Sequence, residues 1–163
     1  MATTLVSVEE YLNTSTSPDC EYVRGVIKYR PAAELDHAAW HAALLRYFAD
    51  RSSAWNTRAY PSVRIMVAAD NFRVPDVTIL SRSAPREQIV SHPPLAVFEI
   101  LSPEDSMTGI LEKLADYLQM GIPAIWVINP EERPKKPSSI STPAANSPPP
   151  PSSNSPAAAS AYR

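Results

Sequence analysis

A strand, a helix and a second strand follow one another between residues 95 and 129, and this succession restricts the fold more than any other part of the sequence. The apolar residues 95–101 predict a buried strand, and residues 104–120 predict a helix that ends before Gly121. The apolar residues 124–129 predict a second strand that is buried on both faces. Two strands joined through one helix form a right-handed crossover and lie parallel in one sheet. This unit predicts an α/β fold in which helices flank a mixed β-sheet.

The residues before this unit predict further elements of the same domain. Trp40, Tyr47 and Phe48 share one face of a helix predicted over 36–50 and are expected in the core. Pro75 is expected to place its strand at a sheet edge or in a bulge, because proline lacks the N–H group that a strand ladder needs. The expected elements are a short helix after Ser7, a hairpin over 21–29, the helix over 36–50, and paired strands over 62–67 and 72–80.

The composition divides the 163 residues into a domain over 1–132 and a tail over 133–163. The tail holds 8 of the 18 prolines, many serines and almost no large apolar side chains, so we expect it to be disordered. The single cysteine excludes an internal disulfide. The net charge of −2 gives no sign of general nucleic-acid binding. Because we find no signal peptide and no stretch long enough to span a membrane, we expect a cytoplasmic protein without membrane contacts.

Two apolar runs each hold one acid, Asp76 in VPDVTIL and Glu99 in LAVFEIL. Burying a carboxylate is costly unless it finds a partner, and Glu21 in the first hairpin can join these two. Carboxylates that gather in one place favour a cation, and oxygen ligands suit Mg²⁺ or Mn²⁺. Lys113 borders the apolar face of the predicted helix over 104–120 and can reach the acids. Acids, a divalent ion and a lysine together are typical of phosphodiester hydrolysis.

These residues give the chain a resemblance to a known family. Pro75-Asp76, Glu99 and a lysine resemble the PD-(D/E)XK nuclease superfamily, although Leu101 stands where the usual lysine would follow the second acid. The chain is more similar to the Uma-type family of restriction-endonuclease-like proteins, in which the lysine lies on the following helix. The matching segments, in order, are SVEEYL, E-x-x-x-G from Glu21, VPDV, E-x-L-S-P from Glu99, EKLADY and MGIPAIWVINPEER, and they cover about residues 7–133.

The resemblance implies a restriction-endonuclease-like core and a DNA endonuclease that uses Mg²⁺ or Mn²⁺. It implies that Asp76 and Glu99 bind the metal, that Glu21 is a third acid of the catalytic site, and that Lys113 is the catalytic lysine. It also places His37 at the rim of the active site. Enzymes that cut both strands often pair, so a homodimer is one assembly to test.

Two other functions stay open. The family continues past the final strand with further strand-forming sequence, whereas the Pro/Ser-rich tail begins here, so a sheet edge or a core face is expected to be exposed. A catalytically inactive relative that acts as an interaction module would fit this tail and the acidic net charge. A phosphodiesterase for RNA or small nucleotides would use the same site. Zinc binding by His37 and His41 is disfavoured, because the pair has no third ligand nearby in the sequence.

Overall fold

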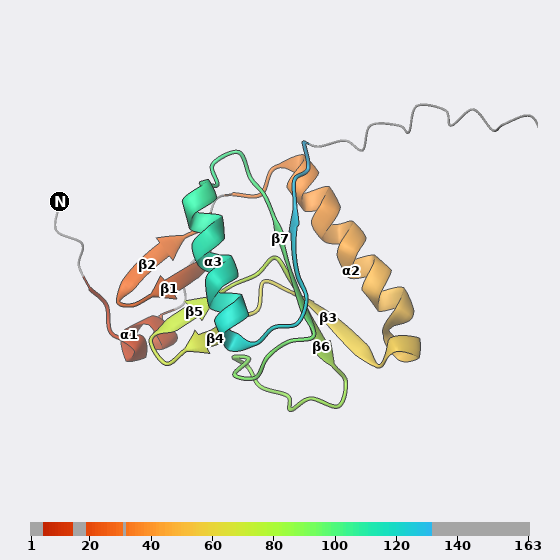
Figure 1. The fold of residues 1–163 in the computed structure, drawn as a ribbon, viewed down its shortest axis with the longest axis horizontal. Helices are drawn as coiled ribbons and strands as arrows, with labels where there is room; N and C mark the ends of the chain where they lie inside the picture. Colours follow the sequence, from red (N-terminus) through yellow and green to blue (C-terminus); the bar gives the residue numbers. More distant parts are fainter. Residues whose placement is uncertain (1–4, 15–18, 31, 132–163) are drawn as a thin grey trace, which may run out of the picture. The chain divides into compact units, whose positions relative to one another are not determined.

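The computed structural model describes residues 5–14, 19–30 and 32–131. The predicted disorder of residues 133–163 lies outside the described residues. Within them, the chain forms α1 (Val8–Asn13), β1 (Cys20–Val23), β2 (Val26–Tyr29), α2 (Leu35–Trp55), β3 (Thr57–Pro61), β4 (Ile65–Ala68), β5 (Asn71–Arg73), β6 (Val77–Ser81), β7 (Ala96–Ile100), α3 (Met107–Met120) and β8 (Ile125–Ile128) (Figure 1). None of these helices is both long and apolar enough to cross a membrane.

The strands form two four-stranded sheets rather than one. The first sheet has the order β2-β1-β5-β4, and the second has the order β3-β6-β7-β8. β7 and β8 are parallel, whereas the other pairs between these strands are antiparallel. The parallel pair joined through α3 is therefore confirmed, and so is a mixed α/β fold flanked by helices.

The division between the sheets falls at Pro75, inside the strand predicted over 72–80. β5 ends at Arg73 in the first sheet, and β6 begins at Val77 in the second. Pairing stops between them because proline cannot donate to a strand ladder. The predicted pairing of 62–67 with the next strand is found between β4 and β5. β6 pairs instead with β3, a strand that the sequence analysis did not predict.

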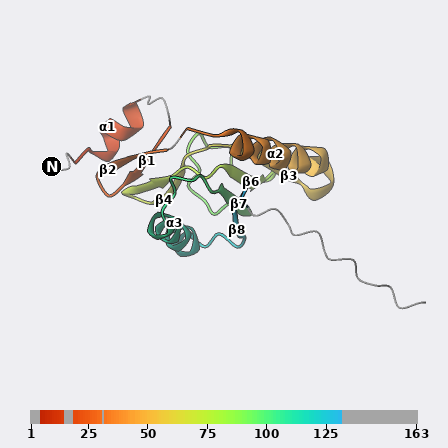
Figure 2. The ribbon, with the colours of Figure 1, turned by 90° about the horizontal axis from the view of Figure 1, so that it is seen from above.

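α2 and α3 pack on opposite sides of the second sheet, whereas α1 packs on the first. Figure 2 shows α1 and α2 on one side of the strands and α3 on the other. The side chains of β7 alternate between these sides, so that Phe98 packs against Phe48 of α2, whereas Val97 packs with Tyr117 of α3. Glu99 lies two residues after Val97 and shares its face. The acid within the apolar strand therefore points toward α3.

Two apolar surfaces are less buried than the sequence predicts. The strand predicted over 124–129 is β8, the last strand of its sheet, and Trp126 is 57 % exposed rather than buried. The helix predicted over 36–50 is the longer α2, and its Trp40 and Tyr47 are half exposed, so their expected core positions are wrong. No strand of the described residues lies beyond β8. Among these residues, β8 is therefore an edge strand, and the exposed edge expected from the sequence stays a prediction.

Candidate active site

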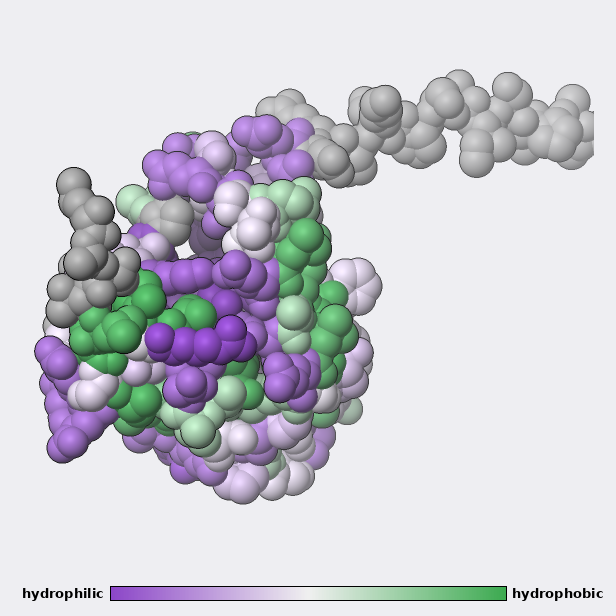
Figure 3. All heavy atoms as spheres, turned by 60° about the vertical axis from the view of Figure 1, so that its left-hand side comes forward, coloured by the Kyte–Doolittle hydropathy of each residue, from purple (hydrophilic) through white to green (hydrophobic). Residues whose placement is uncertain are grey.

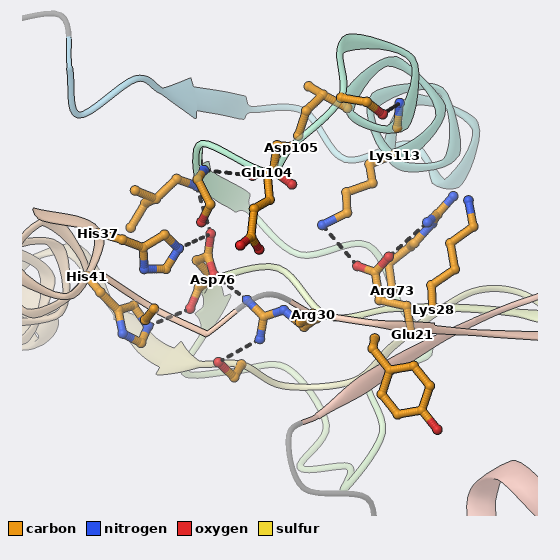
Figure 4. Close-up of a pocket in the computed structure, with 18 residues that line it drawn as sticks. Glu21, Lys28, Arg30, His37, His41, Arg73, Asp76, Glu104, Asp105 and Lys113 are labelled. Atoms are coloured by element: carbon orange, nitrogen blue, oxygen red, sulfur yellow. Dashed lines mark hydrogen bonds and ion pairs between the residues drawn. The ribbon is translucent and has the colours of Figure 1, made fainter. Parts of the chain in front are cut away.

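A pocket of about 380 Å³ lies where β1, β2, the start of α2, the end of β5 and the start of α3 approach one another. Charged side chains dominate its wall: the acids are Glu21, Asp76, Glu104 and Asp105, and the bases are Lys28, Arg30, His37, His41, Arg73 and Lys113. They form two groups in Figure 4, with Glu104 between them. On the face drawn in Figure 3, hydrophilic residues form a band between two hydrophobic areas. The pocket is thus built for charged or strongly polar ligands.

Lys113 enters the pocket from α3 and contacts two of the predicted acids. Its Nζ atom lies 3.1 Å from Oε2 of Glu99 and 3.2 Å from Oε1 of Glu21. Burial lowers the pKa of Lys113, but the two carboxylates outweigh this effect and raise its pKa above the ordinary value. The side chain is therefore a firmly protonated ammonium group held between two strands of different sheets.

Glu99 is almost fully buried, as Glu21 and Asp76 are, and only 3 % of the residue is exposed. Tyr117, one turn after Lys113 on α3, donates a hydrogen bond from its hydroxyl group to Oε1 of Glu99. Burial raises the pKa of Glu99 to about 7, and the nearby charges of Asp76 and Glu21 act in the same direction, against Lys113 and Tyr117. Glu99 does not itself line the pocket, but it contacts Lys113, which does.

Glu21 is held by a buried arginine as well as by Lys113. Nη1 of Arg73 lies 2.9 Å from Oε2 of Glu21, while Nη2 and Nε of Arg73 lie 2.6 and 2.7 Å from Oδ2 of Asp116 on α3. The N–H group of Val74 donates a further bond to Glu21 at 3.2 Å. Burial lowers the pKa of Arg73, but Glu21 and Asp116 outweigh it and raise the pKa. We call Glu21, Arg73, Lys113 and Asp116 the Arg73 cluster.

Asp76 stands at the other side of the pocket, directly before β6. Its Oδ1 atom accepts a hydrogen bond from Nη2 of Arg30, and its Oδ2 atom accepts one of 2.7 Å from the N–H group of Ile100. Nε2 of His37 lies 3.4 Å from Oδ2 of Asp76, and Nε2 of His41 lies 2.8 Å from its backbone oxygen. We call Arg30, His37, His41 and Asp76 the Arg30 cluster.

The structure gathers the predicted site residues, although their roles stay predictions. Glu21, His37, Asp76 and Lys113 line one pocket, and Glu99 contacts Lys113. His37 was expected at the rim, and it lies against the Asp76 carboxylate. Lys113 of α3 thus contacts Glu21 and Glu99, while Asp76 lines the same pocket with other partners.

Several residues of the site escaped the sequence analysis, among them Tyr117, Arg73 and Arg30. Tyr117 lies four residues after Lys113, so both project from one side of the helix, and this spacing was a usable signal. Arg73 lies between the apolar Phe72 and Val74. A basic residue in such a run signals a buried ion pair. Arg30 follows β2 in an irregular segment, and nothing in its neighbourhood in the sequence pointed to Asp76.

The carboxylate oxygens of Asp76 and Glu99 are ligand atoms that suit a divalent ion such as Mg²⁺. Mg²⁺ commonly binds one or two carboxylates and keeps several waters, and Asp76 is close enough to Glu99 to raise its pKa. Among the residues that the structure describes, no three His, Cys, Asp or Glu side chains are grouped so that they could hold an ion together. Arg30 and Lys113 supply the positive charge beside the two acids in the arrangement seen.

Comparisons with known proteins place the chain in a family. The model of the Uma2 family, described as "Putative restriction endonuclease", matches residues 8–135. The chain belongs to the Uma2 family. The crystal structure of a putative nuclease belonging to DUF820 from Anabaena variabilis ATCC 29413 matches this Uma2 chain with a TM-score of 0.70 and 26 % sequence identity. The match covers 78 % of this chain and 75 % of that chain. A comparison with curated proteins finds no match.

These findings confirm two of the predictions from the sequence. The Uma2 match confirms the family that the ordered segments resemble, and the structural match confirms the restriction-endonuclease-like fold class. Both comparisons also support a nuclease at the coarse level.

Proposed function

We propose that this Uma2 protein is a DNA endonuclease that depends on Mg²⁺ or Mn²⁺. The observation that carries the proposal is the position of Lys113, whose amine lies within 3.2 Å of both Glu99 and Glu21 and lines the same pocket as Asp76. These residues come from separate parts of the chain, and an acid pair with a lysine can support phosphodiester hydrolysis when a divalent ion is bound. The Uma2 match and the nuclease neighbour support the same reaction class.

Asp76 and Glu99 are the residues that would hold the ion. When bound, the ion would stabilise negative charge on a phosphate oxygen and make water a better nucleophile. The ammonium group of Lys113 serves as a hydrogen-bond donor and positive charge rather than as a base, because its pKa is raised. Glu21 holds this amine toward Glu99, and Tyr117 fixes the other oxygen of Glu99.

Plasmid cleavage with Mg²⁺ or Mn²⁺ tests this proposal. We expect nicked or linear DNA with the wild type and a large loss of activity with Glu99→Gln, which keeps the shape of the side chain but removes its charge. Asp50→Asn is the matched control, because this acid lies on the exposed face of α2 in a pair with Arg46. Equal activity in all three proteins would refute the assignment. RNA and small cyclic nucleotides in the same assay separate a DNA endonuclease from a phosphodiesterase with another substrate.

A second candidate function is supported by a different observation. Each predicted acid already has an internal cationic partner: Arg30 for Asp76, Lys113 for Glu99, and Arg73 for Glu21. A catalytically inactive interaction module would keep such pairs permanently. Calorimetry separates the two, because an inactive relative binds no Mn²⁺ at millimolar concentration with or without DNA, whereas a nuclease does.

We propose that the nuclease acts on double-stranded DNA as a homodimer, since enzymes that cut both strands often pair two active sites. Sedimentation velocity with and without a DNA duplex measures the assembly. A protein that stays monomeric on DNA and only nicks one strand would contradict this part of the proposal and leave the chemistry intact.

A further inference from the structure

Among the residues that the structure describes, Arg30 pairs with one carboxylate, and it keeps access to the pocket. Its Nη2 atom donates to Oδ1 of Asp76, while its Nη1 atom lies 3.2 Å from the neutral hydroxyl oxygen of Ser62. The Arg30 side chain is 18 % exposed and lines the pocket wall. A guanidinium group can grip a carboxylate or a phosphate with two nitrogens, so this one has capacity for a second anion.

Arg73 lines the same pocket, but two acids hold its guanidinium group. All three of its guanidinium nitrogens contact Glu21 or Asp116, and its side chain is 2 % exposed. Its burial and its contacts with two acids restrict the access of a ligand to Arg73. The contrast indicates that Arg30 can change partners, whereas Arg73 cannot.

A divalent ion bound beside Asp76 would repel the guanidinium group of Arg30. Asp76 carries one negative charge, and a divalent ion beside it would face the Arg30 guanidinium at short range with the same sign. A DNA phosphate in the pocket offers a new partner for Arg30 and adds negative charge near the ion. His37 remains beside Asp76, and the N–H group of Ile100 still holds Oδ2, so Asp76 keeps its position when Arg30 leaves.

We propose that Arg30 is an exchangeable cation, which pairs with Asp76 while no metal ion is bound and moves to a phosphate of DNA when the ion binds. This proposal rests on the proposed nuclease function. It makes metal and DNA binding mutually cooperative, because each ligand removes the pairing that opposes the other. By linkage, DNA raises metal affinity by the same factor as metal raises DNA affinity.

Calorimetry with Mn²⁺ measures this coupling directly. The titrations use the wild type, Arg30→Ala and the control Arg46→Ala on the exposed face of α2, each alone and with a short duplex DNA that carries phosphorothioate linkages. We expect DNA to raise the Mn²⁺ affinity of the wild type and of the control by about tenfold or more. Without DNA, Arg30→Ala should bind Mn²⁺ more tightly than the wild type, and DNA should raise its affinity much less.

The outcomes separate this proposal from the nuclease assignment. If Arg30→Ala binds Mn²⁺ no more tightly than the wild type while the wild type cleaves DNA, Arg30 does not compete with the ion and only the exchange is wrong. If the wild type binds no Mn²⁺ with or without DNA, both proposals fail. Arg30→Gln, which keeps a donor for Asp76 but no charge, replaces the alanine variant if circular dichroism shows that Arg30→Ala is unfolded. Arg30→Lys should keep the coupling.

Discussion

The Arg73 cluster and the Arg30 cluster use the same chemistry in two different settings. In the Arg73 cluster, an arginine and an acid that are both almost fully buried join β1 and β5 to α3. In the Arg30 cluster, a partly exposed arginine from an irregular segment meets an acid at the start of β6. The first arrangement ties structural elements together, and the second leaves a charged group at the edge of a pocket.

The contrast between the two clusters explains how an acid-rich site can be stable without a bound metal ion. Gathered carboxylates repel one another unless positive charge compensates them. Arg73 and Lys113 compensate Glu21 and Glu99 from within the fold, so this half can form on its own. Asp76 is compensated by a residue that a ligand can replace. We therefore assign stability mainly to the Arg73 cluster and ligand exchange mainly to the Arg30 cluster.

The strongest test of this comparison removes each arginine in turn. Arg73→Met should lower the free energy of unfolding by about 3–5 kcal/mol, because it leaves Glu21 and Asp116 without their buried partner. Arg30→Met should lower it by about 1–2 kcal/mol, since Arg30 is partly exposed and Asp76 keeps the hydrogen bond from the N–H group of Ile100. Urea denaturation followed by circular dichroism gives both values. A larger loss for Arg30→Met than for Arg73→Met would reverse the assignment of roles.

The next largest effect is expected on catalysis. Lys113→Met should reduce the rate of DNA cleavage by about 10²- to 10³-fold, which corresponds to about 3–4 kcal/mol, because it removes positive charge at the reacting phosphate. Lys28→Met is the matched control, since Lys28 lines the same pocket but pairs with the exposed Glu112. Its rate should change by less than about tenfold. Cleavage by Lys113→Met at the wild-type rate would remove this residue from the mechanism.

A smaller effect comes from pH, through Glu99. In the folded, metal-free protein, burial raises the pKa of Glu99 from 4.5 to about 7. Between these two pH values, the folded state therefore binds more protons at Glu99 than the unfolded state does. This contribution to stability is present below about pH 4.5 and is lost as the pH rises through about 7, at most about 3 kcal/mol in total. Glu99→Gln should lack it.

The measurement for Glu99 is the difference in unfolding free energy between the wild type and Glu99→Gln across pH 4 to 9, conditions that we choose to bracket both pKa values. The wild type should lose stability relative to the variant as the pH rises. Binding of Mn²⁺ to the wild type should strengthen over the same range, because the ionised carboxylate is the ligand. A constant difference at all pH values would show that Glu99 is not buried as described.

The sequence predicted those parts of the site that depend on regular periodicity. The apolar setting of Glu99 and the position of Lys113 on its helix together indicated that strand and helix would bring them close. The split at Pro75 was expected only as an edge or a bulge, because proline marks where pairing stops but not which sheet receives the next strand. Arg30 could not be predicted, since its contact with Asp76 joins an irregular segment to a distant strand and has no local pattern.

The smallest expected effect concerns Tyr117, which reaches the site from the same helix as Lys113. Tyr117→Phe removes a hydrogen bond to the buried carboxylate of Glu99 and should lower the free energy of unfolding by about 1–2 kcal/mol. Because this bond favours the ionised form of Glu99, its loss should raise the pKa of Glu99 further. Mn²⁺ affinity measured by calorimetry should then rise at a higher pH than in the wild type.

Since Tyr117 contacts Glu99 and not the Arg30 cluster, the DNA-dependent increase in Mn²⁺ affinity should persist in this variant. Loss of that increase in Tyr117→Phe would mean that the two clusters act as one unit.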